Sequence, residues 1–159
     1  MNPTIMTRRL HLIDIENLAG SPRPSSALTR SCAHRYRTLT KEGAGDQTVI
    51  ACNHGAALDV VQAWPARLLQ RSGPDGADQA LLDVLRYERV AERFTGVVVG
   101  SGDGIFAEAV ARLGAAGVTV SVVSHRRSLS KRLALAASDV VYFDTKLPPA
   151  AAMRIRGAA

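Results

Sequence analysis

Three aspartates stand at positions where their carboxylates can meet and hold a cation. Asp14 lies in the apolar run from Leu10 to Ile15, Asp103 follows the valines 97–99 in a glycine-rich turn, and Asp78 opens a helical pattern. Three gathered carboxylates with no Arg or Lys in the same motifs repel one another, and a hard divalent cation neutralises them. Carboxylates and water suit Mg²⁺ or Mn²⁺. Such a site activates water and screens the charge of a phosphodiester, which predicts phosphodiester hydrolysis.

Each carboxylate also has a purely structural interpretation. Asp78 suits a helix N-cap or first turn, and Asp103 suits the cap of a helix that begins near Ile105. Asp14 is harder to explain in this way, because a carboxylate that ends an apolar strand needs a partner or a cation. Both interpretations stay open at this stage for Asp78 and Asp103.

The elements that position these acids alternate between strand and helix patterns. Short apolar runs predict strands over residues 10–15, 48–52, 66–70, 97–100, 118–123 and 140–143, of which 66–70 is interrupted by Arg67 and Gln70 and is expected nearer a sheet edge. Helical spacing predicts helices from Ser26 to the glycines at 43 and 45, over 56–63, 79–94 and 105–115, and from Ser128 or Ser130 to Ala137. Strict alternation predicts an α/β fold with a mostly parallel, doubly wound sheet between two helix layers.

The predicted topology brings the acids together. Right-handed crossovers place the carboxyl ends of all parallel strands at one edge of the sheet, and open α/β sheets bind their ligands there. Asp14, Asp78 and Asp103 all fall at that edge, and Asn17 can turn back toward the same cleft. We expect one domain over residues 1–144 and a loose tail over 145–159, which contains two prolines and three consecutive alanines.

Composition narrows the class of protein and of partner. The 20 Lys and Arg against 14 Asp and Glu give a net charge of +6, which favours polyanionic partners. Aromatic residues are only 4%, which argues against base stacking as the main mode of nucleic-acid contact. The two cysteines show neither metal spacing nor a disulfide framework, so a reducing cytoplasm is expected, and the N-terminal pattern predicts neither a secretion signal nor a membrane span. Homodimerisation through apolar helices is a further possibility.

Three segments carry a family resemblance. Residues 12–18 (LIDIENL), 76–83 (GADQALLD) and 99–107 (VGSGDGIFA) resemble the signature blocks of the NYN domains, a branch of the PIN-like nucleases. The segment from Ser128 to Asp144 resembles the end of that domain, so that the match spans roughly residues 8–144. The aspartate-x-x-asparagine and serine-glycine-aspartate blocks are fairly specific when they occur together in this order.

The resemblance implies a metal-dependent ribonuclease of PIN-like fold. It implies that Asp14, Asp78 and Asp103 bind Mg²⁺ or Mn²⁺ and act in catalysis, and that Asn17 and Ser101 support them. Many relatives carry a further aspartate two residues after the position of Asp103, where this chain has Ile105. The departure leaves three outcomes open, namely one metal instead of two, weak activity or none, and the possible substitutes are Asp75, Asp83 and Asp139.

Other polar residues are candidates for contact with RNA. Asn53 and His54 follow the second predicted strand at the same sheet edge, and a tight basic cluster suited to flanking phosphates consists of Arg126, Arg127, Lys131 and Arg132. Two other functions compete with the ribonuclease. One is a non-catalytic RNA-binding or regulatory module on the same fold. The other is a phosphatase with Asp14 as nucleophile, which ranks low because such enzymes need a second aspartate where this chain has Glu16.

Overall fold

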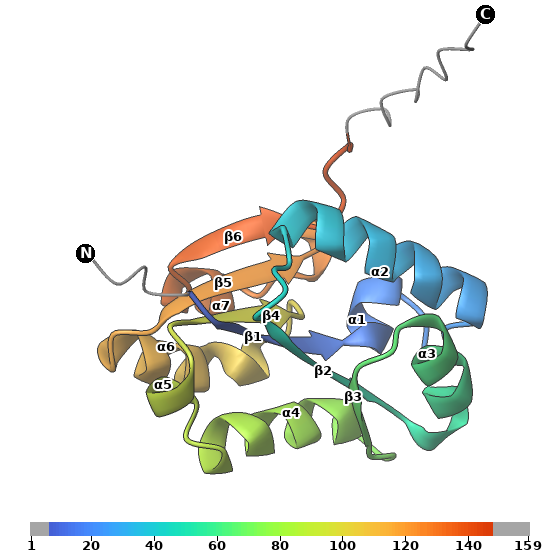
Figure 1. Ribbon diagram of the computed structural model, residues 1–159, viewed down its shortest axis with the longest axis horizontal. Helices are drawn as coiled ribbons and strands as arrows, with labels where there is room; N and C mark the ends of the chain where they lie inside the picture. The colour runs from blue at the N-terminus through green and yellow to red at the C-terminus, as the bar shows by residue number, and fades with distance from the viewer. Residues whose placement is uncertain (1–6, 148–159) are drawn as a thin grey trace, which may run out of the picture.

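The computed structural model describes residues 7–147, which form a parallel sheet covered by helices on both faces (Figure 1). The strands are β1 (Arg9–Asp14), β2 (Gln47–Cys52), β3 (Arg67–Gln70), β4 (Gly96–Gly100), β5 (Thr119–Ser124) and β6 (Asp139–Tyr142). The α-helices are α1 (Ile15–Ala19), α2 (Ser26–Thr40), α3 (Ala57–Ala63), α4 (Gly76–Tyr87), α5 (Val90–Arg93), α6 (Ala107–Ala115) and α7 (Lys131–Ala136). Short 3-10 turns are η1 (His54–Ala56), η2 (Gly104–Phe106) and η3 (Arg126–Ser128).

The order of the strands fixes where a ligand can bind. The sheet has six strands in the order β3-β2-β1-β4-β5-β6, and every neighbouring pair is parallel. Strands β2 and β3 therefore extend the sheet beyond β1, and β5 and β6 extend it beyond β4 in the opposite direction. Helices that follow β1 and β4 leave to opposite faces, which opens a crevice between the carboxyl ends of these two strands.

Alternate side chains of each strand enter two separate cores. Leu12 and Val99 face a cluster with α4, α5, α6 and α7, whereas Ile13 and Val98 face a cluster with α1, α2 and α3. Figure 1 shows α2 and α3 on one side of the sheet and α4, α5 and α6 on the other. The strands β1, β4 and β5 are buried almost throughout, as expected for parallel strands covered on both faces. This arrangement confirms the predicted three-layer α/β/α fold.

Two helix predictions differ from the structure. Residues 79–94 are not one helix, because Arg89 takes a left-handed backbone (φ 53°) that separates α4 from α5. The five-residue helix α1 was not predicted, and it begins directly at the end of β1 with Asp14 as its N-cap. The predicted tail, residues 145–159, lies outside the described residues from position 148 onward. Within the described part of the chain, no helix is long and apolar enough to cross a membrane.

A buried polar network holds the amino-terminal end of β1. The His11 ring bonds the Tyr36 hydroxyl through Nδ1 (2.8 Å) and the Asp46 carboxylate through Nε2 (3.1 Å). Arg9 donates to the same carboxylate from its main chain and its guanidinium. Burial lowers the pKa of His11, so the ring stays neutral at pH 7. His11 is therefore a structural residue, and the network fixes the strand that ends in Asp14.

Candidate functional site

A cleft of about 230 Å³ opens at the carboxyl ends of β1 and β4. Its lining includes five residues that the sequence predicted as site residues: Asp14, Asn17, Asn53, Asp78 and Asp103. Asp14 ends β1, Asn17 lies on α1, Asp78 on α4, and Asp103 after β4. The topology therefore brings the three predicted acids to one cleft.

Asp14 is held in place by the helix that it starts. As N-cap of α1 it accepts a hydrogen bond at Oδ1 from the main-chain N–H of Asn17 (3.2 Å). Only 6% of Asp14 is exposed, and burial raises the pKa of its carboxyl group. The Asp78 side chain is a further neighbour of the Asp14 carboxyl group in the cleft.

Asp78 is the least satisfied acid of the site. It lies in the first turn of α4 without capping it, because the N-cap position belongs to Asp75. Asp78 is 8% exposed, and its buried Oδ1 has no hydrogen-bond partner. Burial, with the Asp14 carboxylate as the next cause, raises the pKa of Asp78 to about 8. The arginine in the cleft wall, Arg71, forms its ion pair with Asp83 instead (3.1 Å). Asp78 is therefore not the N-cap of α4, but it is an acid of the first turn, as the other form of the structural interpretation predicted.

Asp103 belongs to a turn that its own hydrogen bonds stabilise. Its Oδ1 accepts from the main-chain N–H of Ile105 (2.9 Å), so that Asp103 caps η2 as the structural interpretation predicted. Ser101 is fully buried, and its Oγ accepts from the Asp103 N–H (3.3 Å). Asn17 Oδ1 accepts from the Gly102 N–H (3.1 Å). This last bond joins the end of β1 to the end of β4 across the crevice, so Asn17 and Ser101 both position the turn.

The donor set of the cleft fits a small divalent cation held mainly by two carboxylates. In residues 7–147 no three His, Cys, Asp or Glu side chains are arranged to enclose a metal ion by themselves. Mg²⁺ does not require such an enclosure, because it keeps several waters and is commonly bound through one or two carboxylates. Asp14 and Asp78 form a buried acid pair, and the unpartnered Oδ1 of Asp78 is the atom that such a cation would satisfy.

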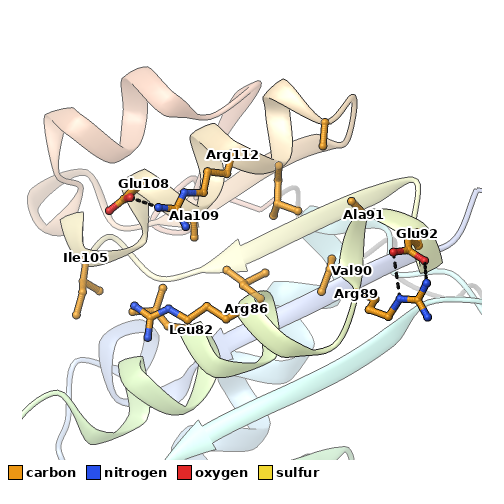
Figure 2. A pocket seen from close by; sticks show the side chains of 13 residues that line it. Leu82, Arg86, Arg89, Val90, Ala91, Glu92, Ile105, Glu108, Ala109 and Arg112 are labelled. Atoms are coloured by element: carbon orange, nitrogen blue, oxygen red, sulfur yellow. Dashed lines mark hydrogen bonds and ion pairs between the residues drawn. The ribbon is translucent and has the colours of Figure 1, made fainter.

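Ile105 faces away from the acid cleft. Its side chain lines a second groove of about 420 Å³ between α4, α5 and α6, together with Leu82, Val90 and Ala109 (Figure 2). Position 105 therefore contributes no side chain to the acid cleft.

Of the possible substitutes for the missing aspartate, only one lies at the site. Asp75 lines the cleft. Asp83 lies further along α4, where it pairs with Arg71, and Asp139 begins β6, at the opposite edge of the sheet. Neither Asp83 nor Asp139 lines the acid cleft, so of the three possible substitutes only Asp75 is placed to act there.

The two polar residues after β2 divide between the cleft and the surface. Asn53 lines the cleft, but its side chain is engaged locally: Oδ1 accepts from the Ala56 N–H, and Nδ2 donates to the Pro22 carbonyl (2.6 Å). His54 lies outside the cleft wall, where its Nδ1 is hydrogen-bonded to Ser72 Oγ (2.7 Å). His54 is therefore a neighbour of the site and not part of its wall.

The basic cluster borders the turn of Asp103 without lining the acid cleft. Arg126, Arg127, Lys131 and Arg132 are exposed, and none of them forms an ion pair within residues 7–147. The loop that carries them packs on the turn, where the Ser130 N–H donates to the Gly102 carbonyl (2.8 Å). These cations can therefore reach only the parts of a substrate that extend beyond the cleft.

Two charged residues of the cleft were missed from the sequence. Glu16 lines the wall and accepts at Oε1 from the Asn53 N–H (2.7 Å), which ties the ends of β1 and β2 together. Arg71 lines the wall from the loop before α4. The position of Glu16 two residues after Asp14 was a signal for its placement, whereas nothing in the pattern around Arg71 marked it.

Comparison with known proteins supports the fold alone. No family model matches the chain, and no characterised protein matches its sequence. A similar solved structure is that of a protein of unknown function from Vibrio parahaemolyticus, with 16% sequence identity and a TM-score of 0.64. The alignment covers 91% of this chain and 97% of the other. At this identity the likeness extends to the arrangement of helices and strands.

Proposed function

We propose that this protein is a Mg²⁺- or Mn²⁺-dependent ribonuclease. The observation that carries the proposal is the buried Asp78 carboxylate, which has an unpartnered Oδ1 and lies beside Asp14 at the crevice between β1 and β4. A buried carboxylate pair without a protein cation is costly unless it is protonated or binds a metal ion. In a metal-dependent enzyme, binding of the cation would offset this cost.

The residues of the cleft divide the work in the proposed reaction. Asp14 and Asp78 hold the cation, which supplies Lewis acidity to activate water and offset charge on the phosphodiester. Asp103 faces the same cleft, and Asn17 fixes the turn of Asp103 through its bond to Gly102. Preorganised positions of this kind lower the barrier because the groups need not move during the reaction.

RNA is the substrate class that we assign to the site. The likeness of the three sequence blocks to the NYN domains supports this choice, as does the unpaired basic cluster beside the turn of Asp103. Cations in such a loop bind phosphates on either side of the cleaved bond and make the affinity depend on salt. The free, buried thiols of Cys32 and Cys52 agree with a reducing compartment, so we place the activity in the cytoplasm.

Replacing Asp103 by asparagine tests the assignment. We expect the wild-type protein to cleave single-stranded or structured RNA with added Mn²⁺ or Mg²⁺ and to be inactive in EDTA. Asp103→Asn keeps an oxygen for the Ile105 N–H, so it should fold normally while its cleavage rate falls by at least about tenfold. Asp139→Asn is the matched control, because Asp139 is exposed at the opposite sheet edge. Equal rates for wild type and Asp103→Asn would refute the assignment.

A non-catalytic RNA-binding module is the second candidate. It is favoured by the local bonds of Asp14 and Asp103, which each accept a main-chain N–H as helix caps, and by Ile105 in place of an acid. This function predicts RNA retention that is indifferent to EDTA and no turnover at any metal concentration. Metal-dependent cleavage that disappears with Asp103→Asn would eliminate it.

A further inference from the structure

One arginine of the basic cluster is stacked on an aromatic ring. The Arg126 guanidinium carbon lies 3.9 Å from the centroid of the Tyr142 ring, closer than any other arginine–aromatic pair in residues 7–147. Arg126 is exposed, and within the same residues it forms no ion pair. The Arg126 guanidinium thus lies over the Tyr142 ring, and it forms no ion pair with a carboxylate.

Other exposed arginines of the molecule differ from Arg126. Around the groove of Figure 2, Arg89 pairs with Glu92 and Arg112 pairs with Glu108. Their charges are neutralised within the chain, so they offer little to a polyanion. Arg126 and Arg127, which follow β5, are among the exposed cations of residues 7–147 that form no ion pair.

The backbone holds Arg126 next to the turn of Asp103. The N–H of Arg126 donates to Asp144 Oδ1 (3.4 Å), and the Ser128 N–H donates to the His125 carbonyl (3.1 Å). Gly102 is so closely covered by this loop that a Cβ there would lie 2.3 Å from the Ser128 carbonyl oxygen. A nucleic-acid strand that passes from the cleft across the turn of Asp103 therefore reaches η3.

A guanidinium plane that has an aromatic ring on one face can stack a nucleobase on its other face. Bases that are splayed out of a helix stack on aromatic rings and on arginine planes, and the cation–π attraction between Arg126 and Tyr142 fixes the plane before the base arrives. A base inside a duplex is already stacked on both faces and is not available. Lysine provides the same charge without a plane, so the two residue types are not equivalent at such a position.

We propose that Arg126, stacked on Tyr142, binds one unpaired base of a single-stranded RNA that extends from the acid cleft. The identity of the ligand rests on the proposed ribonuclease function. A single platform of this kind agrees with an aromatic content of 4%, since the remaining contacts in this loop are to phosphates through Arg127, Lys131 and Arg132. Sequence selectivity, where it exists, then arises at one nucleotide position.

Binding without metal separates this proposal from catalysis. The affinity of a fluorescent single-stranded RNA oligonucleotide is measured in EDTA for the wild type, Arg126→Lys and Arg127→Lys. Both variants keep the charge, so we expect about a tenfold loss for Arg126→Lys and less than about a twofold loss for Arg127→Lys. Tyr142→Phe should keep the wild-type affinity, and Tyr142→Leu should match Arg126→Lys. On a duplex of the same sequence the variants should not differ from the wild type.

Two results would overturn the base platform. One is an equal loss for Arg126→Lys and Arg127→Lys, which would mean that both side chains contact phosphates only. The other is an affinity that stays the same whichever nucleotide is made abasic. If one base stacks on Arg126, its removal must lower the affinity at that position. A protein that binds RNA as described but never cleaves it would refute the ribonuclease proposal and leave the platform standing.

Discussion

Replacing Asp78 by asparagine is expected to abolish metal-dependent cleavage and, in the absence of metal, to make the protein more stable. The cleavage rate should fall by at least about 100-fold, because the variant loses a charged oxygen of the buried acid pair. The stability gain has a separate cause. The Asp78 carboxylate is buried beside Asp14 without a cation, and a neutral amide of the same shape removes that repulsion.

The pH dependence of this stability gain has a definite sign. The pKa of Asp78 is raised from 3.8 to about 8 in the folded protein. A raised carboxyl pKa means that the folded state binds the proton more tightly, so stability is highest below the unfolded pKa and is lost as the pH rises to about 8. In EDTA above pH 8, Asp78→Asn should unfold roughly 5 °C higher than the wild type, a gain on the order of a few kcal/mol. The difference should shrink as the pH falls toward about 4.

Thermal unfolding followed by circular dichroism measures both effects. Asp83→Asn is the matched control, since it makes the same change on the same helix at a surface ion pair with Arg71, and its unfolding temperature should change little. Saturating Mn²⁺ should stabilise the wild type and leave Asp78→Asn unaffected, because only the intact pair binds the cation. A metal-free Asp78→Asn protein that is less stable than the wild type at high pH would show that the carboxylate has a structural partner.

Replacing Gly102 by alanine is expected to damage the fold and the site together. The added Cβ would lie 2.3 Å from Ser124 Oγ and from the Ser128 carbonyl oxygen, and 2.7 Å from the Ser128 carbonyl carbon. Backbone atoms cannot turn aside as a flexible side chain does, so the loop after β5 must move away from the turn of Asp103. We expect a loss of about 2–3 kcal/mol in the free energy of unfolding. The displaced turn should also lower the cleavage rate by more than about tenfold.

Gly114→Ala provides the matched control for this prediction. Gly114 lies on the exposed side of α6, and nothing lies within 4 Å of an added Cβ. Alanine is the better helix former, so this variant should be as stable as the wild type or about 0.5–1 kcal/mol more stable. Urea unfolding of the two variants measures the difference. Equal stabilities would mean that the loop after β5 tolerates the displacement and does not brace the site.

The fold and the central acids could be predicted because they follow from strand patterns alone. The apolar runs that end at Asp14 and before Asp103 mark buried parallel strands, and the handedness rule then places their carboxyl ends at one edge. The strand order could not be predicted, because alternating strands and helices are compatible with more than one order. Only the observed order, with β1 next to β4, brings Asn17 within hydrogen-bond distance of Gly102.

The remaining differences have local physical causes. The break between α4 and α5 occurs at Arg89 with no glycine or proline to signal it, while apolar spacing continues through Val90. The basic cluster lies at the same sheet edge as the acids, but β4 and its turn lie between the two groups. The sequence pattern does not give the distance between them. Ile105 lies on η2, and its side chain lines the groove with Leu82, whereas Asp103 lines the acid cleft.

The orientation of Ile105 also limits how this site can be redesigned. A carboxylate introduced at position 105 would enter the apolar groove beside Leu82 and Val90 and would add a desolvated charge to the wrong surface. A second cation would have to be recruited from the opposite wall, where Asp75 already lines the cleft in a left-handed backbone (φ 54°) at the start of α4. Under the proposed function, further carboxylate ligands would therefore have to come from the loop before α4.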